Sequence, residues 1–290
     1  MRHGLSRRAF VKSVGGAGVA AASPAVASER SDELRFGLTP VLLTSDLELL
    51  ARLRLYLDRT VGMPVRLVTR RSYQEVTLLL LSGELDAAWI CGFPFVAYQP
   101  QLALVAVPVW QGKPLYRSYV ITGADRAAAR LEDLRGDIHA FSDPDSNSGW
   151  LVTATALAEM GLTPEKFFRQ TIFTWAHRNV VRAVASGLAM SGSVDGYVYE
   201  VLRETEPELV AGTRIVRKSE LLGFPPVACS AALADAPKTR RLQRALVDMR
   251  EDEEGRALLH MLRLDGFSIE QPSLFDTIAA EVAIVRGAGG

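Results

Sequence analysis

Residues that hold metals and cofactors are scarce in this sequence. Its 290 residues include two cysteines and four histidines. There is no C-x-x-C motif, no H-E-x-x-H motif and no G-x-G-x-x-G after a strand pattern. The cysteines, Cys91 and Cys229, lie far apart in the sequence. In an oxidising compartment they would form either a bridge or two buried thiols, and the sequence leaves both open. We expect no metal and no cofactor.

The N-terminus lacks a membrane-spanning run, although it has the features of an export signal. The apolar stretch over residues 13–22 is too short and too mild to cross a membrane. It follows residues 6–12 (SRRAFVK) and leads to residues 25–27 (AVA). This order is typical of a twin-arginine signal with an A-x-A cleavage site. We therefore expect residues 1–27 to be removed and the mature chain to be periplasmic and soluble.

An excess of charge of either sign is also missing. The chain carries 33 Lys and Arg against 33 Asp and Glu. Removing the basic residues of the predicted signal, which has no acidic ones, leaves a net charge of about −4. A weakly acidic protein does not favour nucleic acid or an anionic membrane surface as a partner. An anionic ligand would have to be held by local geometry.

Strand and helix patterns alternate along the chain, which predicts an α/β fold with mainly parallel sheets flanked by helices. The predicted strands include Leu34–Leu38, Val65–Val68, Leu102–Val109, Ile138–Phe141 and Val194–Val198, and the predicted helices include Asp46–Thr60, Tyr73–Leu81 and Lys238–Arg263, the last with a break at Gly255. About 260 residues can form two modest cores. We expect two lobes, with residues 28–118 plus 225–290 forming lobe 1 and residues 119–224 forming an inserted lobe 2.

The most distinctive segment is residues 141–150 (FSDPDSNSGW), which precedes an apolar helical run. Ser, Asp and Asn before a helix cap its first turn, whose N–H groups have no intrahelical acceptor. Such a loop is either a plain helix cap or a pocket for a tetrahedral oxyanion at the positive end of the helix. It follows a predicted strand, and ligands of α/β folds bind at the carboxyl ends of strands. The segment Gly92-Phe93-Pro94-Phe95 occupies the same kind of position in lobe 1.

The motif D-P-x-S-x-S-G over Asp143 to Gly149 resembles the signature loop of one family, the phosphonate-binding group of periplasmic substrate-binding proteins of ABC transporters. Other segments agree in order and spacing, namely residues 72–73 (SY), 83–89 (GELDAAW), 116–118 (YRS) and 176–177 (AH). The resemblance runs from about Leu34 to about Val282. It implies a type 2 periplasmic binding fold, in which a ligand cleft lies between the two lobes of a protein that is not an enzyme.

The resemblance implies a ligand site of hydroxyl, amide and imidazole groups, contributed by Tyr73, Tyr116, Ser146, Asn147, Ser148, His177 and Tyr197. The family's middle position in the serine loop is commonly Thr, and Asn147 offers an amide donor there. A protonated His177 would add a charge-assisted hydrogen bond. On spacing alone, His177 reads as a core or capping histidine and Tyr73 as a half-buried helix tyrosine.

The ligand class follows from a departure from the family pattern. Members that bind an aminoalkyl phosphonate need acidic residues for its ammonium group, and we expect these around Tyr197 and Phe224, where this chain has a phenol and a phenyl ring. Burying an unpaired ammonium there would cost several kcal/mol. The prediction is therefore a monomer that captures phosphite, methylphosphonate or phosphate and delivers it to an ABC permease.

Two other functions remain open. Cys91 precedes Gly92 at a predicted strand end, where it is either a small buried residue or a thiol ligand facing the cleft. Some proteins of this broad family are periplasmic sensors of arsenite, so a sensor that signals to a membrane histidine kinase is the alternative function. A hydrolase using Ser146 or Ser148 with His177 is disfavoured. The chain has no G-x-S-x-G elbow, and the backbone engages the oxygen of a capping serine.

Overall fold

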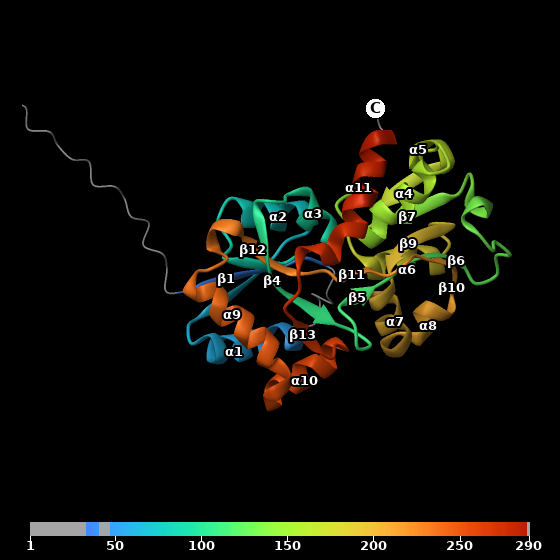
Figure 1. The fold of residues 1–290 in the computed structure, drawn as a ribbon. Helices are drawn as coiled ribbons and strands as arrows, with labels where there is room; N and C mark the ends of the chain where they lie inside the picture. The colour runs from blue at the N-terminus through green and yellow to red at the C-terminus, as the bar shows by residue number, and fades with distance from the viewer. Residues whose placement is uncertain (1–32, 41–46, 289–290) are drawn as a thin grey trace, which may run out of the picture. The chain divides into compact units, whose positions relative to one another are not determined.

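The structure is a computed structural model that describes residues 33–40 and 47–288. The predicted twin-arginine signal lies outside the described residues. The described chain forms two sheets flanked by helices and one two-stranded ribbon (Figure 1).

The first sheet has six strands in the order β13-β4-β12-β3-β1-β2. Its strands are β1 (Leu34–Leu38), β2 (Val65–Thr69), β3 (Ala87–Trp89), β4 (Leu102–Val109), β12 (Val227–Ser230) and β13 (Gly266–Ser268). Helices α2 and α3 lie on one face of this sheet and α1 and α9 on the other (Figure 1). The helices are α1 (Leu47–Val61), α2 (Tyr73–Leu81), α3 (Gly92–Ala97), α9 (Pro237–Val247) and α10 (Glu253–Leu262). Because helices cover both faces, every residue of β3 and every residue of β1 except Arg35 is buried.

The second sheet has five strands in the order β10-β6-β9-β7-β8. They are β6 (Ser118–Gly123), β7 (Ile138–Phe141), β8 (Gln170–Phe173), β9 (Ser191–Asp195) and β10 (Thr213–Lys218). Its helices are α4 (Val152–Ala158), α5 (Pro164–Phe167), α6 (His177–Ala185), α7 (Gly196–Thr205) and α8 (Pro207–Ala211). In the ribbon, β5 (Leu115–Tyr116) pairs antiparallel with β11 (Leu222–Gly223). The last helix, α11 (Asp276–Ala288), contacts both α3 and α4.

Both sheets are mixed, which corrects the expectation of mainly parallel sheets. Strand β1 is parallel to β2 and β3, and β7 is parallel to β8 and β9. However, β12 runs antiparallel to β3 and β4, and β6 runs antiparallel to β9 and β10. The alternation of strands and helices predicts only βαβ crossovers. Strands β6 and β12, which follow the segments that pass between the two sheets, enter in the opposite direction.

Two predicted element boundaries are wrong. The strand predicted over Val194–Val198 ends at Asp195, because the Asp195 side chain accepts a hydrogen bond from Val198 N and caps α7. The break predicted at Gly255 lies at Asp252, which caps α10 by accepting a hydrogen bond from Gly255 N. In both places a capping aspartate outweighs the apolar pattern.

A histidine is buried inside the second sheet. The His139 ring, with no exposed surface, lies 2.8 Å from Ser191 Oγ and 2.9 Å from Ser193 Oγ and stacks on Phe168 at 4.1 Å between ring centroids. Burial lowers its pKa from 6.5 to about 3. The folded protein therefore keeps His139 neutral at pH values where the unfolded chain binds a proton.

This burial predicts a loss of stability in acid. As the pH falls from 6.5 toward about 3, His139 lowers the free energy of unfolding by up to about 1.4 kcal/mol per pH unit. Replacing it with Gln should therefore flatten the acid limb, as measured by urea unfolding at several pH values. Burial raises the pKa of Asp195 and Glu281 to about 7, so these two groups make the folded protein more stable as the pH falls. Both remain in the variant and do not change the comparison. Equal pH slopes in the two proteins would contradict this prediction.

Candidate functional site

The first part of the site is the start of helix α2, which packs against the first sheet. Ser72 caps α2 by accepting a hydrogen bond from Glu75 N, and the Glu75 side chain accepts one from Ser72 N, which completes a capping box. Tyr73 is the first residue of the helix. Its backbone N–H donates to Asp143 Oδ2 at 3.1 Å. The cap thus fixes the position of Tyr73 against the loop that follows β7 of the second sheet.

The second part is the serine loop itself. After β7, Asp143 Oδ1 accepts a hydrogen bond from Asp145 N at 2.8 Å, and Ser146 Oγ accepts one from Gly149 N at 3.0 Å. Residues Asn147–Leu151 form a π-helix that continues into α4. Ser146 is its N-cap, as the capping pattern predicts. Because the Ser146 oxygen accepts a backbone bond, its own hydroxyl hydrogen remains able to donate.

The third part is His177, the first residue of α6. Its Nδ1 accepts a hydrogen bond from Asp195 N at 3.1 Å, so the ring proton lies on Nε2. Nε2 lies 3.2 Å from Tyr73 Oη and donates to it, which leaves the Tyr73 hydroxyl hydrogen free for another acceptor. Burial lowers the pKa of His177 to about 3. The imidazole is neutral, so it orients Tyr73 and adds no positive charge.

Asn147 joins the serine loop to two residues from the side of the first sheet. Its Nδ2 donates to Tyr116 Oη at 3.0 Å, and its backbone N–H donates to Cys91 Sγ at 3.1 Å. The Cys91 sulfur therefore accepts a hydrogen bond from a first-turn N–H that we expected to bind the ligand. Burial raises the pKa of the Cys91 thiol to about 12, so it remains protonated. Asn147 Oδ1 and Ser142 Oγ are buried without a hydrogen-bond partner.

Ser148 differs from its neighbours because it faces a carboxyl group. Its hydroxyl donates to Asp195 Oδ2 at 3.4 Å, and its carbonyl oxygen accepts from Ser118 Oγ at 2.6 Å. Burial raises the pKa of Asp195 to about 7, against the opposing effect of the hydrogen bonds it accepts. This carboxyl caps α7 and also lies against the serine loop.

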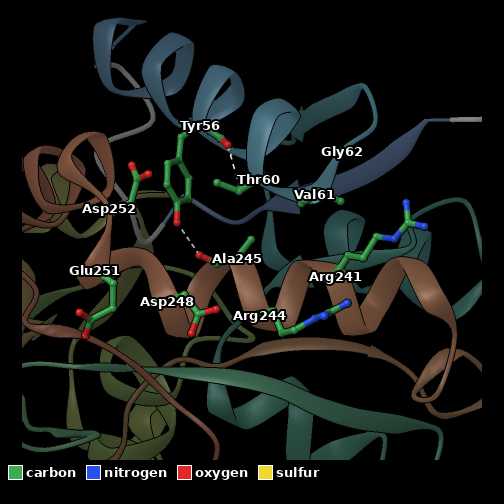
Figure 2. Close-up of a pocket in the computed structure, with 10 residues that line it drawn as sticks. All are labelled: Tyr56, Thr60, Val61, Gly62, Arg241, Arg244, Ala245, Asp248, Glu251 and Asp252. Atoms are coloured by element: carbon green, nitrogen blue, oxygen red, sulfur yellow. Dashed lines mark hydrogen bonds between the residues drawn. The ribbon is translucent and has the colours of Figure 1, made fainter.

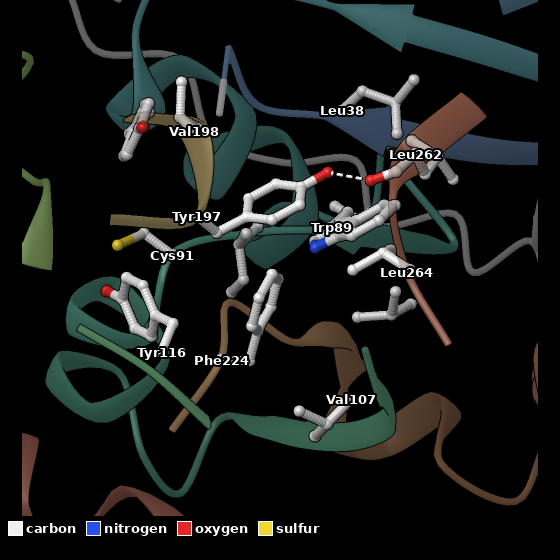
Figure 3. Packing of buried hydrophobic residues seen from close by; sticks show 14 of the residues in the cluster. Leu38, Trp89, Cys91, Val107, Tyr116, Tyr197, Val198, Phe224, Leu262 and Leu264 are labelled. Carbon is white, nitrogen blue, oxygen red and sulfur yellow. Dashed lines mark hydrogen bonds between the residues drawn. The ribbon is translucent and has the colours of Figure 1, made fainter. Parts of the chain in front are cut away.

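Tyr197, which the resemblance also assigned to the ligand, lies in a different environment. Its hydroxyl donates to Leu262 O at 2.5 Å, and its ring packs edge-on against Phe224 at 5.2 Å between centroids. Phe224 also contacts the Tyr116 ring, at 5.5 Å. Figure 3 shows the three rings together, with Cys91 beside Tyr116. Tyr197 thus contributes an aromatic surface, and its hydroxyl already has an acceptor.

Six of the predicted side chains form hydrogen bonds at or beside the serine loop, and each has at most 1% of its surface exposed: Tyr73, Tyr116, Ser146, Asn147, Ser148 and His177. Sequence reasoning missed Asp143 as the link to α2. The available signal was a carboxylate directly after a strand and before a proline. It also missed the sulfur contact of Cys91, which no sequence pattern indicates. Cys91 and Cys229 are both buried free thiols.

A separate hollow of about 660 Å³ lies between α1 and α9 (Figure 2). Its one large buried polar group, the Tyr56 hydroxyl, already donates to Ala245 O at 2.6 Å. At its edge, Asp252 pairs with Arg59 at 2.8 Å. The other charged side chains that line it, those of Arg241, Arg244, Asp248 and Glu251, are exposed, so we assign the candidate site to the buried serine loop instead.

Several solved structures share the fold of this chain. A binding-protein component of an ABC phosphonate transporter from Pseudomonas aeruginosa is similar, with a TM-score of 0.80 and 19% identity over 89% of this chain and 87% of that chain. PhnD1 from Prochlorococcus marinus in complex with methylphosphonate has a TM-score of 0.79 and 15% identity, over 88% of this chain and 98% of that chain. The alkanesulfonate-binding protein SsuA from Xanthomonas axonopodis pv. citri has a TM-score of 0.56 and 18% identity, over 89% of this chain and 90% of that chain. The fold is that of type 2 periplasmic binding proteins, as predicted.

The sequence itself places the chain more narrowly. Residues 36–274 match the family model described as "ABC transporter, phosphonate, periplasmic substrate-binding protein". The chain therefore belongs to this family, whose members are the substrate-binding components of transporters and not enzymes. Within the described residues, no helix is long and apolar enough to cross a membrane, and no group of three or more His, Cys, Asp or Glu side chains is placed to hold a metal ion.

Proposed function

We propose that this protein captures a small phosphorus oxyanion without an amine group, namely phosphite, methylphosphonate or phosphate, and delivers it to an ABC permease. The observation that carries the proposal is a set of buried hydroxyl groups whose oxygens already accept a hydrogen bond from the protein. In Tyr73, Tyr116 and Ser146 the oxygen accepts a hydrogen bond from the protein. Each of these hydroxyls can therefore donate to an anion. The three residues are fully buried.

The aromatic surface beside these donors supports a ligand without an ammonium group. Phe224 has 1% of its surface exposed and packs between Tyr116 and Tyr197. An ammonium group against these rings would be desolvated without a carboxylate dedicated to it, because Asp195 already accepts bonds from Val198 N and Ser148. A methyl group or a hydrogen on phosphorus fits such a surface without this cost.

Calorimetric titration of the chain from Ser28 onward tests the proposal. The ligands are phosphite, methylphosphonate, phosphate, aminoethylphosphonate and arsenite. We expect tight binding of one amine-free phosphorus oxyanion. Aminoethylphosphonate binding more tightly than methylphosphonate would refute the ligand class. Arsenite binding that requires Cys91, with no response to any phosphorus ligand, would instead favour the sensor function.

Ligand entry requires the two sheets to move apart, because the proposed donors are closed off from solvent. We propose a hinge at the β5–β11 ribbon, where the chain passes between the sheets. Cys91 then offers a probe, since its thiol has 2% of its surface exposed and lies beside Asn147.

Saturating methylphosphonate should slow the reaction of Cys91 with a thiol reagent by about tenfold or more, because ligand favours the closed state, in which the thiol is covered. Mass spectrometry after timed alkylation measures the rate at each cysteine. Cys229, a buried residue of β12 that forms no hydrogen bond with the serine loop in the described part of the chain, serves as the internal control. Equal protection of both thiols would mean global stabilisation and would contradict the hinge.

A further inference from the structure

The carboxamide of Asn147 is only half satisfied by the protein. Its Nδ2 donates to Tyr116 Oη, while its Oδ1 is buried and has no partner. The residue itself has no exposed surface. An unpaired buried carbonyl oxygen is costly unless a donor meets it, and native structures rarely leave one without a reason. A ligand that fills the site must therefore bring a hydrogen to this position.

The other polar groups around Asn147 do not supply that hydrogen. The Ser148 hydroxyl is directed to Asp195 Oδ2. The Asn147 backbone N–H is directed to Cys91 Sγ, and the neighbouring Gly149 N–H to Ser146 Oγ. The site thus presents hydroxyl donors together with one carbonyl acceptor. A ligand that consists only of acceptors cannot satisfy this arrangement.

We propose that Asn147 determines specificity by accepting a hydrogen bond from the protonated oxygen of a phosphonate, phosphite or phosphate monoanion, and so rejects sulfonates. This inference rests on the proposed function and adds the protonation state of the ligand to it. A hydrogen-phosphonate monoanion carries one P–OH donor, which pairs with Asn147 Oδ1. Its remaining oxygens accept from the hydroxyls of Tyr73, Tyr116 and Ser146.

A sulfonate of the same shape has three acceptor oxygens and no proton at neutral pH. Bound in the same place, it would set a lone pair against Asn147 Oδ1 and leave the carbonyl unpaired. A site built to hydrogen-bond a substrate O–H discriminates strongly against an analogue that lacks it. The fold alone does not make this distinction, because it is shared with an alkanesulfonate-binding protein.

Calorimetry with methylphosphonate and methanesulfonate, two anions of similar size and shape, tests the inference. The wild-type protein should bind methylphosphonate about 10- to 100-fold more tightly, the range expected for one unpaired buried acceptor. In N147T, the carbonyl is replaced by a hydroxyl that can donate, so the preference should shrink to about threefold or less. N179T is the matched control, because Asn179 lies on α6 and its amide donates to Thr174 O instead of to a residue of the serine loop.

The pH dependence provides a second, independent readout. As the pH rises through the second ionisation of methylphosphonate, the P–OH donor is lost, and affinity should fall about tenfold per unit above that point. Protein groups that face the site also titrate, so methanesulfonate, which does not ionise in this range, reports their contribution at each pH. The groups are Asp143, Asp195, His177, Cys91, Tyr73 and Tyr116.

The outcomes separate the inference from the function on which it rests. Methylphosphonate binding with an equal affinity for methanesulfonate, or an affinity that rises as the second proton leaves, would overturn the inference and leave the proposed function standing. Such a result would mean that the Asn147 amide presents its NH₂ group to the ligand. If the wild-type protein binds no phosphorus oxyanion, the proposed function fails and the inference fails with it.

Discussion

Replacing Tyr73 with Phe is expected to weaken methylphosphonate binding by about 100-fold. The change removes a hydroxyl that would donate to a charged ligand, a bond of about 1.5–3 kcal/mol. It also leaves His177 Nε2–H, which lies 3.2 Å from the Tyr73 oxygen, without its acceptor in a fully buried position. Titration calorimetry measures the affinity, and thermal unfolding in the absence of ligand measures any loss of stability.

The control for this prediction is Tyr199→Phe. The Tyr199 hydroxyl forms a buried hydrogen bond to Thr213 Oγ1 at 3.0 Å, so its removal costs stability in a similar way. It should change the affinity by less than about threefold. If the Tyr73 variant binds methylphosphonate as well as this control does, then Tyr73 is a structural tyrosine and the proposed donor set is wrong.

Replacing Gly149 with Ala is expected to abolish measurable binding and to lower the free energy of unfolding by about 2–3 kcal/mol. A Cβ at this position would overlap Ser142 Oγ and would lie 2.8 Å from both Ser142 Cβ and Ser146 Oγ, closer than such atoms approach. The loop would have to move, and with it the hydrogen bond from Gly149 N to Ser146 Oγ. The same calorimetric and unfolding measurements apply.

Gly123→Ala is the matched control, since no atom lies within 4 Å of the position of its Cβ. It should stay within about 0.5 kcal/mol of the wild-type stability and keep its affinity. Adding Ser142→Gly to the Gly149 variant removes both contacts with Ser142, leaves the one with Ser146 Oγ and should restore part of the stability. Normal binding by Gly149→Ala alone would show that the tight packing of this loop does not matter to the ligand.

The sequence was most informative where one short segment determines the outcome. The serine loop could be predicted because Ser146 satisfies a first-turn N–H through its own side chain, a local effect that a sequence pattern carries. The same holds for the start of α2 at Tyr73, which the capping residues Ser72 and Glu75 fix. The fold class was likewise predicted from the alternation of strands and helices.

Features that depend on distant segments could not be predicted. The hydrogen bonds of Tyr73 to Asp143 and of Asn147 to Cys91 join residues 70 and 56 positions apart. The hydroxyl of Tyr197 has its acceptor at Leu262, 65 residues away. Strand direction is also a long-range property, which is why the mixed sheets were missed. The π-helix at Asn147 has no composition signal that distinguishes it from an ordinary helix start.

If the proposed hinge opens the site, the hydrogen bonds that cross between its two sides set the population of the closed state. Tyr73 N to Asp143, Tyr73 Oη to His177, Asn147 N to Cys91 and Asn147 Nδ2 to Tyr116 are all made by protein groups alone. At about 0.5–1.5 kcal/mol each, they favour closure before any ligand arrives. A ligand that enters only through the open form then has its apparent affinity and its association rate scaled by the fraction of protein that is open. A substitution that weakens one of these bonds should therefore speed ligand capture and also shorten the time for which the ligand is retained.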